Sequence, residues 1–224
     1  NKTYILDLDI KISDLKIDEY ESKKKIYAEI YNYIVNYIAY FLHKTNIVEN
    51  KLTVYTGYSN KFNYIKDKTT KKLISKISHR YAINVKMNKE KLLKITKYFN
   101  SQIKDNNLLP ESIKYYETSN NIQIQSHINH LNKLKETNNI KLYEFDESIY
   151  DNKNLRLPNS SKNGEYRPLI VNEMPELFVM KNNLNINENI NNAIFNQIFN
   201  IIDSSNKQHN TNISHLDIVD TNNI

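Results

Sequence analysis

The sequence predicts an α/β chain in which helices flank a mixed or antiparallel sheet. Apolar residues recur at three- and four-residue spacing over 22–45, which indicates one long amphipathic helix. Alternating side chains over 52–58 and 76–85 indicate strands. Helical and strand periods therefore occur in turn along the same stretch of chain, as expected for an α/β core.

The elements are expected in a definite order. Along the chain we expect a buried strand at 4–10, the helix at 22–45 capped by Ser22, a strand at 52–58, a Lys-rich polar loop at 59–72, a strand at 76–85, a helix capped by Asn88, a helix at 126–137, strands at 141–146, 155–157 and 166–171, and a helix at 188–202. The residues from 203 onward are polar and Asn-rich, as in a linker or tail.

These elements divide the chain into an α/β core over 1–180 and an Asn-rich helix and tail over 181–224. The chain has no initiator Met, and its first residues run directly into a strand. We therefore expect the sequence to be a fragment of a longer protein, with elements before Asn1 missing.

Composition narrows the class of protein. The 224 residues are 39% hydrophobic and 25% charged, which suffices for a packed core. The absence of Cys excludes disulfides, zinc ribbons and thiol nucleophiles. No apolar run of about 18 residues and no signal peptide occur, so we expect an intracellular protein without a membrane partner.

The net charge of +6 favours polyanionic partners, nucleic acid above all. Asn, Ile and Lys supply 37, 31 and 28 residues, a bias typical of an AT-rich genome. Such coding makes a protein basic without any nucleic-acid role, so charge alone does not decide between these explanations.

The first candidate site is the segment Asp7-Leu8-Asp9. Residues i and i+2 of a strand point to the same face, so the two carboxylates are neighbours. They repel each other unless a cation lies between them, and hard oxygen ligands suit Mg²⁺ or Mn²⁺. Removing one acid is then expected to maintain or raise stability. The alternative is an edge strand with two solvated acids.

The second candidate site is the segment Lys76-Ile77-Ser78-His79-Arg80. Strand alternation puts Lys76, Ser78 and Arg80 on one face, as a possible phosphate cradle, and His79 on the opposite face. The alternative is a polar sheet face directed to solvent.

The third candidate site combines Asp146 with a downstream polar turn. Asp146 follows Phe145, and the segment Leu155-Arg156-Leu157-Pro158-Asn159-Ser160-Ser161-Lys162-Asn163-Gly164 comes next, followed by Tyr166-Arg167-Pro168-Leu169. All three Arg of the chain lie in the second and third sites, which favours planar bidentate contacts. The turn lacks the spacing of a Walker A loop.

Two weaker candidates lie nearby in the sequence. Glu144 is a possible substitute for Asp146 as a metal ligand, and the pair His127 and His130 is a weak zinc candidate.

Together these segments resemble the catalytic core of the archaeo-eukaryotic primase superfamily, in its primase-polymerase and large-DNA-virus primase-helicase branches. Asp7 and Asp9 resemble its first motif, Lys76-Ile77-Ser78-His79 its second and Asp146 its third. The downstream segment from Leu155 to Lys162 resembles the family nearly residue for residue. The family commonly has Lys-x-Ser-Arg-His, so the last two residues of the second motif are exchanged here, and Arg80 takes the usual place of His.

The resemblance implies an RRM-like primase core that acts as a nucleotidyltransferase on NTP or dNTP with a single-stranded DNA template. It implies that Asp7, Asp9 and Asp146 are catalytic and hold Mg²⁺ or Mn²⁺. It assigns nucleotide binding to the motif and downstream residues Lys76, Ser78, His79, Arg80, Arg156 and Lys162. A C-terminal helicase domain and a viral replication site also belong to this type.

The alternative is a non-catalytic basic nucleic-acid-binding domain with structural acids. Convergence of the three carboxylates within about 4–6 Å is the geometric discriminator, since two metals share such a site.

Overall fold

The computed structural model describes residues 2–44, 54–108, 122–150, 159–161 and 168–173. In these residues the strands are β1 (Lys2–Ser13), β2 (Val54–Tyr58), β3 (Lys61–Lys66), β4 (Leu73–Met87) and β5 (Ile170–Glu173), and the helices are α1 (Ile17–Lys44), α2 (Lys89–Lys104), α4 (Ile122–Thr137) and the 3-10 turn η1 (Glu147–Tyr150). The predicted α/β class is confirmed.

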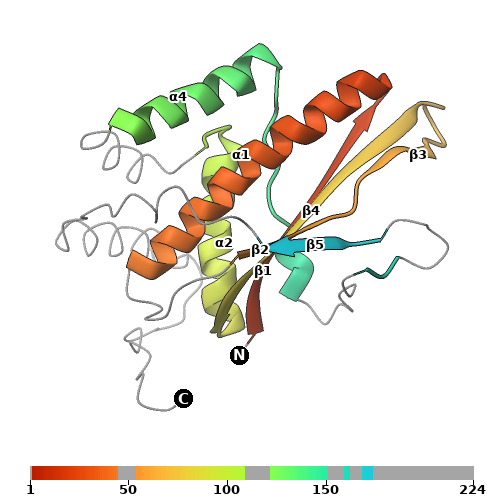
Figure 1. Ribbon diagram of the computed structural model, residues 1–224. Coiled ribbons are helices and arrows are strands. Elements are labelled where there is room, and N and C mark those ends of the chain that lie inside the picture. The colour runs from red at the N-terminus through yellow and green to blue at the C-terminus, as the bar shows by residue number, and fades with distance from the viewer. Residues whose placement is uncertain (1, 45–53, 109–121, 151–158, 162–167, 174–224) are drawn as a thin grey trace, which may run out of the picture.

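Within the described ranges the five strands form one sheet in the order β1-β4-β2-β5, and β3 pairs with β4. Every strand pair is antiparallel. The long strand β4 lies at the centre: β1 covers one edge, and β2 and β3 follow each other along the other edge. Figure 1 shows α1 running past these strands, with α4 beside it.

One face of the sheet packs against α1 and α2. The even-numbered residues of β1 from Tyr4 to Ile10 are fully buried, as are their partners on β4. The hydroxyl of Tyr4 is hydrogen-bonded to Thr96 of α2, and the hydroxyl of Tyr81 donates to Asn32 of α1. Both helices therefore cover this core face, and the odd-numbered residues of β1 lie on the other face.

The outer edge of β1 is covered by the chain around η1. The hydroxyl of Tyr150 accepts from the backbone N–H of Ile5 at 3.0 Å and donates to the carbonyl of Ile5 at 2.7 Å. The backbone N–H of Asp146 donates to the carbonyl of Asp7 at 2.8 Å. These contacts satisfy backbone groups that an open edge would leave unpaired, and they fix Asp146 beside β1.

Residues 141–146 were expected to be a strand, and that prediction is wrong. Side chains take the place of a neighbouring strand there. The hydroxyl of Tyr31 bonds to both backbone groups of Tyr143, and the amide of Asn100 bonds to both backbone groups of Phe145. The segment therefore has no regular secondary structure before η1.

Other boundaries also differ from the sequence prediction. The expected loop at 59–72 contains β3, helix α1 begins at Ile17 instead of Ser22, and α4 begins at Ile122 instead of Ser126. Glu19 accepts a hydrogen bond from the backbone N–H of Lys16, which stabilises the earlier start of α1. The expected N-cap at Asn88 is confirmed.

The expected strand at 155–157, the helix at 188–202 and the tail lie outside the described residues. Among the residues that are described, no helix combines the length and apolar character needed to cross a bilayer.

Candidate functional site

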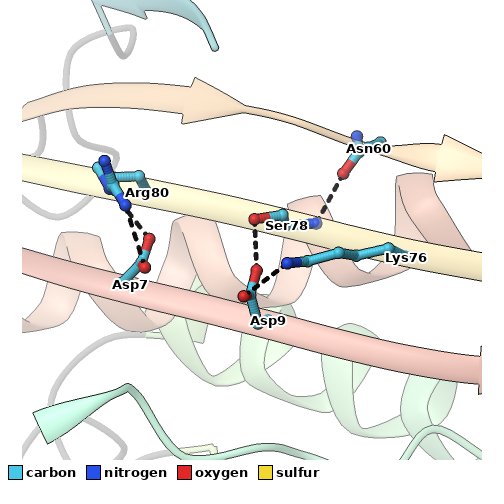
Figure 2. Close-up of polar contacts among 6 residues, drawn as sticks. All are labelled: Asp7, Asp9, Asn60, Lys76, Ser78 and Arg80. Atoms are coloured by element: carbon cyan, nitrogen blue, oxygen red, sulfur yellow. Dashed lines mark hydrogen bonds and ion pairs between the residues drawn. The ribbon is translucent and has the colours of Figure 1, made fainter. Parts of the chain in front are cut away.

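Acidic residues of β1 and basic residues of β4 meet on the sheet face opposite the helices. The register places Asp7 directly across from Arg80 and Asp9 directly across from Ser78. Directly opposed residues of an antiparallel pair project from the same face. Figure 2 shows these side chains in front of β1 and β4, with helices behind the strands.

Asp7 and Arg80 form a two-bond ion pair. Nε of Arg80 lies 3.0 Å from one carboxylate oxygen of Asp7, and a terminal guanidinium nitrogen lies 3.1 Å from the other. The side chains are only 17% and 20% exposed, respectively. Both the fork geometry and the partial burial make this contact stronger than an ordinary surface ion pair.

Arg80 also has an unused donor. Its Nη1 atom is buried and has no hydrogen-bond partner among the described residues. A buried donor without an acceptor costs on the order of 1–3 kcal/mol. Gly57 of β2 lies directly across from Arg80 and has no side chain to cover the guanidinium. Gly57, one of the two Gly of the chain, therefore contributes to the site, a role that the sequence pattern did not reveal.

Asp9 is held by two donors from β4. Nζ of Lys76 lies 2.7 Å from one carboxylate oxygen, and Oγ of Ser78 lies 2.5 Å from the other. Asp9 is 46% exposed, whereas Lys76 is only 11% exposed. Asp9 is therefore the more accessible of the two acids for a ligand.

Asn60 is a further site residue that the sequence analysis missed. Its side-chain oxygen accepts a hydrogen bond from the backbone N–H of Ser78 at 2.9 Å (Figure 2). The backbone N–H of Ser59 donates to the carbonyl of Ser78 at 2.9 Å. These two contacts fix the position of Ser78 on β4. Asn60 follows β2 by two residues and has no motif signal in this Asn-rich chain.

His79 lies on the core face and does not join the other predicted nucleotide-binding residues. It is fully buried, and burial lowers the pKa of its imidazole to about 4. Its ring packs edge-on against Tyr58 at 4.8 Å between centroids. The imidazole is therefore neutral near pH 7, and Arg80 occupies the site face, as the alternation of the strand predicts.

Asp146 reaches β1 through its backbone. Besides the contact with the Asp7 carbonyl, its carboxylate accepts hydrogen bonds from the backbone N–H and hydroxyl of Ser148 at 2.9 and 2.5 Å. The exposed Asp146 side chain thus caps η1. Asp146 therefore lies next to Asp7 in space, and its carboxylate already has donors from Ser148.

The donor types fit a hard divalent cation, since Asp7, Asp9 and Asp146 offer carboxylate oxygens. Within the residues described here, no group of three or more His, Cys, Asp or Glu is arranged to hold a metal ion. His130 instead contacts Glu29 at 3.1 Å, and His127 packs on Tyr33. Glu144 is exposed.

The basic residues of the downstream segment, Arg156 and Lys162, lie outside the described residues. The short described piece around Ser160 is linked to Leu169 by two backbone hydrogen bonds, of 2.8 and 3.2 Å. Leu169 leads into β5, which pairs with β2 beside Gly57. The described part of this segment therefore lies next to the start of β5, a strand of the same sheet as the acidic and basic face.

Comparison of the chain with models of protein families, with curated proteins and with solved structures finds no match in any of the three. Function must therefore be argued from the chemistry of this face.

Proposed function

We propose that this chain is the catalytic core of a DNA primase or primase-polymerase, which joins NTP or dNTP units on a single-stranded DNA template. The observation that carries the proposal is the shared sheet face. Two adjacent carboxylates lie directly beside two cations and a hydroxyl, at the positions where the primase-like motifs occur. Acids and phosphate-binding groups side by side are what nucleotidyl transfer needs.

Arg80 and Lys76 act by exchanging partners. In the described arrangement both cations are bonded to the acids of β1. The phosphates of an incoming nucleotide offer the same fork geometry to Arg80 as a carboxylate does, and its unused Nη1 gains an acceptor. Transfer of these cations to phosphate releases the carboxylate oxygens of Asp7 and Asp9.

Asp7 and Asp9, with Asp146 from the neighbouring segment, are the residues that would hold Mg²⁺ or Mn²⁺. When bound, such ions stabilise both the attacking and the leaving oxygen of phosphoryl transfer. The hydrogen bond from the backbone N–H of Ser78 to Asn60 holds the backbone of that serine in position while Asp9 changes partner.

The fold supports the same proposal in part. An antiparallel sheet with helices on one face and polar side chains on the other fits an RRM-like core. We propose that the polar face carries the reaction and that template DNA approaches from that side. Arg156 and Lys162 are proposed as further contacts to the nucleotide, by resemblance alone.

A second candidate function is a non-catalytic nucleic-acid-binding domain. One observation favours it specifically: each acid of β1 is neutralised by a cation of the same chain, which makes the acids structural. In that case the basic residues bind a polyanion and no reaction takes place.

Primer synthesis distinguishes the two candidates. Labelled nucleotides are supplied with a single-stranded template and Mg²⁺ or Mn²⁺, with chelator as the blank. The wild type is expected to form product, and Asp9→Asn is expected to form none while remaining folded. The control is Glu136→Gln, an exposed acid on α4 with the same charge change. Absence of product from the wild type with either metal and either nucleotide class would reject the catalytic proposal.

A further inference from the structure

Three lysines stand side by side across three strands on the candidate site face. Lys76 of β4 lies directly across from Lys11 of β1 on one side and from Lys61 of β3 on the other. Neighbouring strands are about 5 Å apart, so this lysine row spans about 10 Å. Because Lys11 is two residues from Asp9 on the same strand face, the row begins next to the acidic pair.

Like charges placed directly opposite each other destabilise a sheet. Lys76 is compensated by Asp9. Lys11 and Lys61 are exposed and form no ion pair with any described residue. The row therefore keeps uncompensated positive charge at two of its three positions, which an anionic ligand would neutralise.

The surroundings of the row suit a nucleic-acid strand better than a single small anion. Nζ of Lys76 lies 6.0 Å from the ring centre of Tyr64 on β3, so an aromatic ring lies beside the cations. The turn after β3 adds the exposed Lys68 and Lys71. Its one acid, Asp67, is used inside the turn, where its carboxylate accepts from Thr69 and Thr70. Basic residues interleaved with aromatic rings are typical of single-strand binding surfaces.

We propose that the two uncompensated ends of the lysine row, Lys11 and Lys61, bind the phosphate backbone of single-stranded nucleic acid and guide the strand toward Asp9. The inference rests on the nucleic-acid partner of the proposed function, yet it requires no catalysis. A nucleotide triphosphate is the competing occupant, because it offers the same phosphate chemistry. The extent of the row, continued by the lysines of the β3–β4 turn, favours a polymeric strand.

The test is the salt dependence of oligonucleotide binding. A labelled single-stranded DNA oligonucleotide is titrated in chelator, without nucleotide, over a range of monovalent salt. Affinity falls as salt rises, so the slope of log affinity against log salt is negative. The double variant Lys11→Gln/Lys61→Gln should make this slope less steep by about 1.4, since each single-strand phosphate contact contributes about 0.7. At 0.1 M salt this corresponds to about 25-fold weaker binding.

The matched control is Lys97→Gln/Lys133→Gln, which removes two exposed lysines from α2 and α4. This control is expected to leave the slope nearly unchanged. Thermal unfolding at low salt provides a second measurement: the row variant should be at least as stable as the wild type, because it removes repulsion between opposed lysines. That result excludes misfolding as the cause of weaker binding.

Three outcomes would overturn the proposal. Equal effects of the two double variants would mean general charge attraction. An unchanged slope in the row variant would mean that the row does not contact the strand. Loss of affinity for a non-hydrolysable nucleotide, with oligonucleotide binding unchanged, would assign the row to the triphosphate. Absence of primer synthesis by the wild type, together with the predicted change of slope, would reject catalysis while supporting the lysine row.

Discussion

The two acids of β1 are expected to differ in what they contribute to stability. Asp7→Ala leaves Arg80, which is only 20% exposed, without the carboxylate that accepts two of its bonds. Each charge-assisted hydrogen bond contributes roughly 1.5–3 kcal/mol to stability. In the variant, water molecules that hydrate the guanidinium of Arg80 recover part of this free energy. The expected loss in the free energy of unfolding is about 2–3 kcal/mol. Asp9 is itself 46% exposed, and the flexible side chain of Lys76 can turn its ammonium toward water once Asp9 is removed, so Asp9→Ala should cost only about 1 kcal/mol.

Urea unfolding at pH 7 and low salt, in the presence of chelator, measures both losses. Glu136→Ala is the control for the change of net charge and should lie within about 0.5 kcal/mol of the wild type. Repulsion between two unpaired acids predicts the opposite sign, with stability maintained or raised by either change. A rise in stability in both variants, or a larger loss for Asp9→Ala than for Asp7→Ala, would refute the ion-pair reasoning.

Three further predictions concern other parts of the chain. Burial lowers the pKa of His79 to about 4. The unfolded chain therefore takes up the proton first as pH falls, and about 3 kcal/mol of stability should be lost between about pH 6.5 and 4. His79→Gln should flatten that part of the stability curve in urea titrations. Tyr150→Phe removes both hydrogen bonds to Ile5 and should cost about 1–2 kcal/mol in the same assay; an unchanged midpoint would contradict the edge contact. Arg156→Lys should weaken nucleotide affinity about ten- to a hundredfold and leave single-stranded DNA affinity nearly unchanged, because Lys lacks the bidentate fork. Equal loss of both affinities would assign Arg156 to a nucleic-acid surface.

The parts of the fold that the sequence predicted depend on local periodicity. The two-residue period places Asp7 and Asp9 on one face of β1, and Lys76, Ser78 and Arg80 on one face of β4. The structure agrees with both assignments. Their pairing into ion pairs depends on the register between β1 and β4, and a register between strands far apart in sequence has no local signal.

The errors have equally specific causes. Within the expected strand at 141–146, residues 143–146 alternate apolar and polar side chains, yet Tyr31 and Asn100 satisfy the backbone where a strand partner would stand. Strand β3 was hidden because lysines at both of its ends gave the segment the character of a loop. Asn60 lacked a signal because Asn is the most frequent residue in the chain, so neither type nor spacing distinguished it.

The central claim is that Asp9 and its neighbours receive a divalent ion together with a nucleotide. Its most direct test is equilibrium binding of a complex of Mn²⁺ with a non-hydrolysable nucleoside triphosphate. The bound fraction is measured from the electron paramagnetic resonance signal of protein-bound Mn²⁺. We expect binding by the wild type, at least about tenfold weaker binding by Asp9→Asn, and unchanged binding by Glu136→Gln, since a charge-assisted contact of 1.5–3 kcal/mol is lost only in the first variant. Equal binding by all three proteins, or no binding by the wild type, would contradict the claim and leave the acids of β1 as structural partners of Arg80 and Lys76.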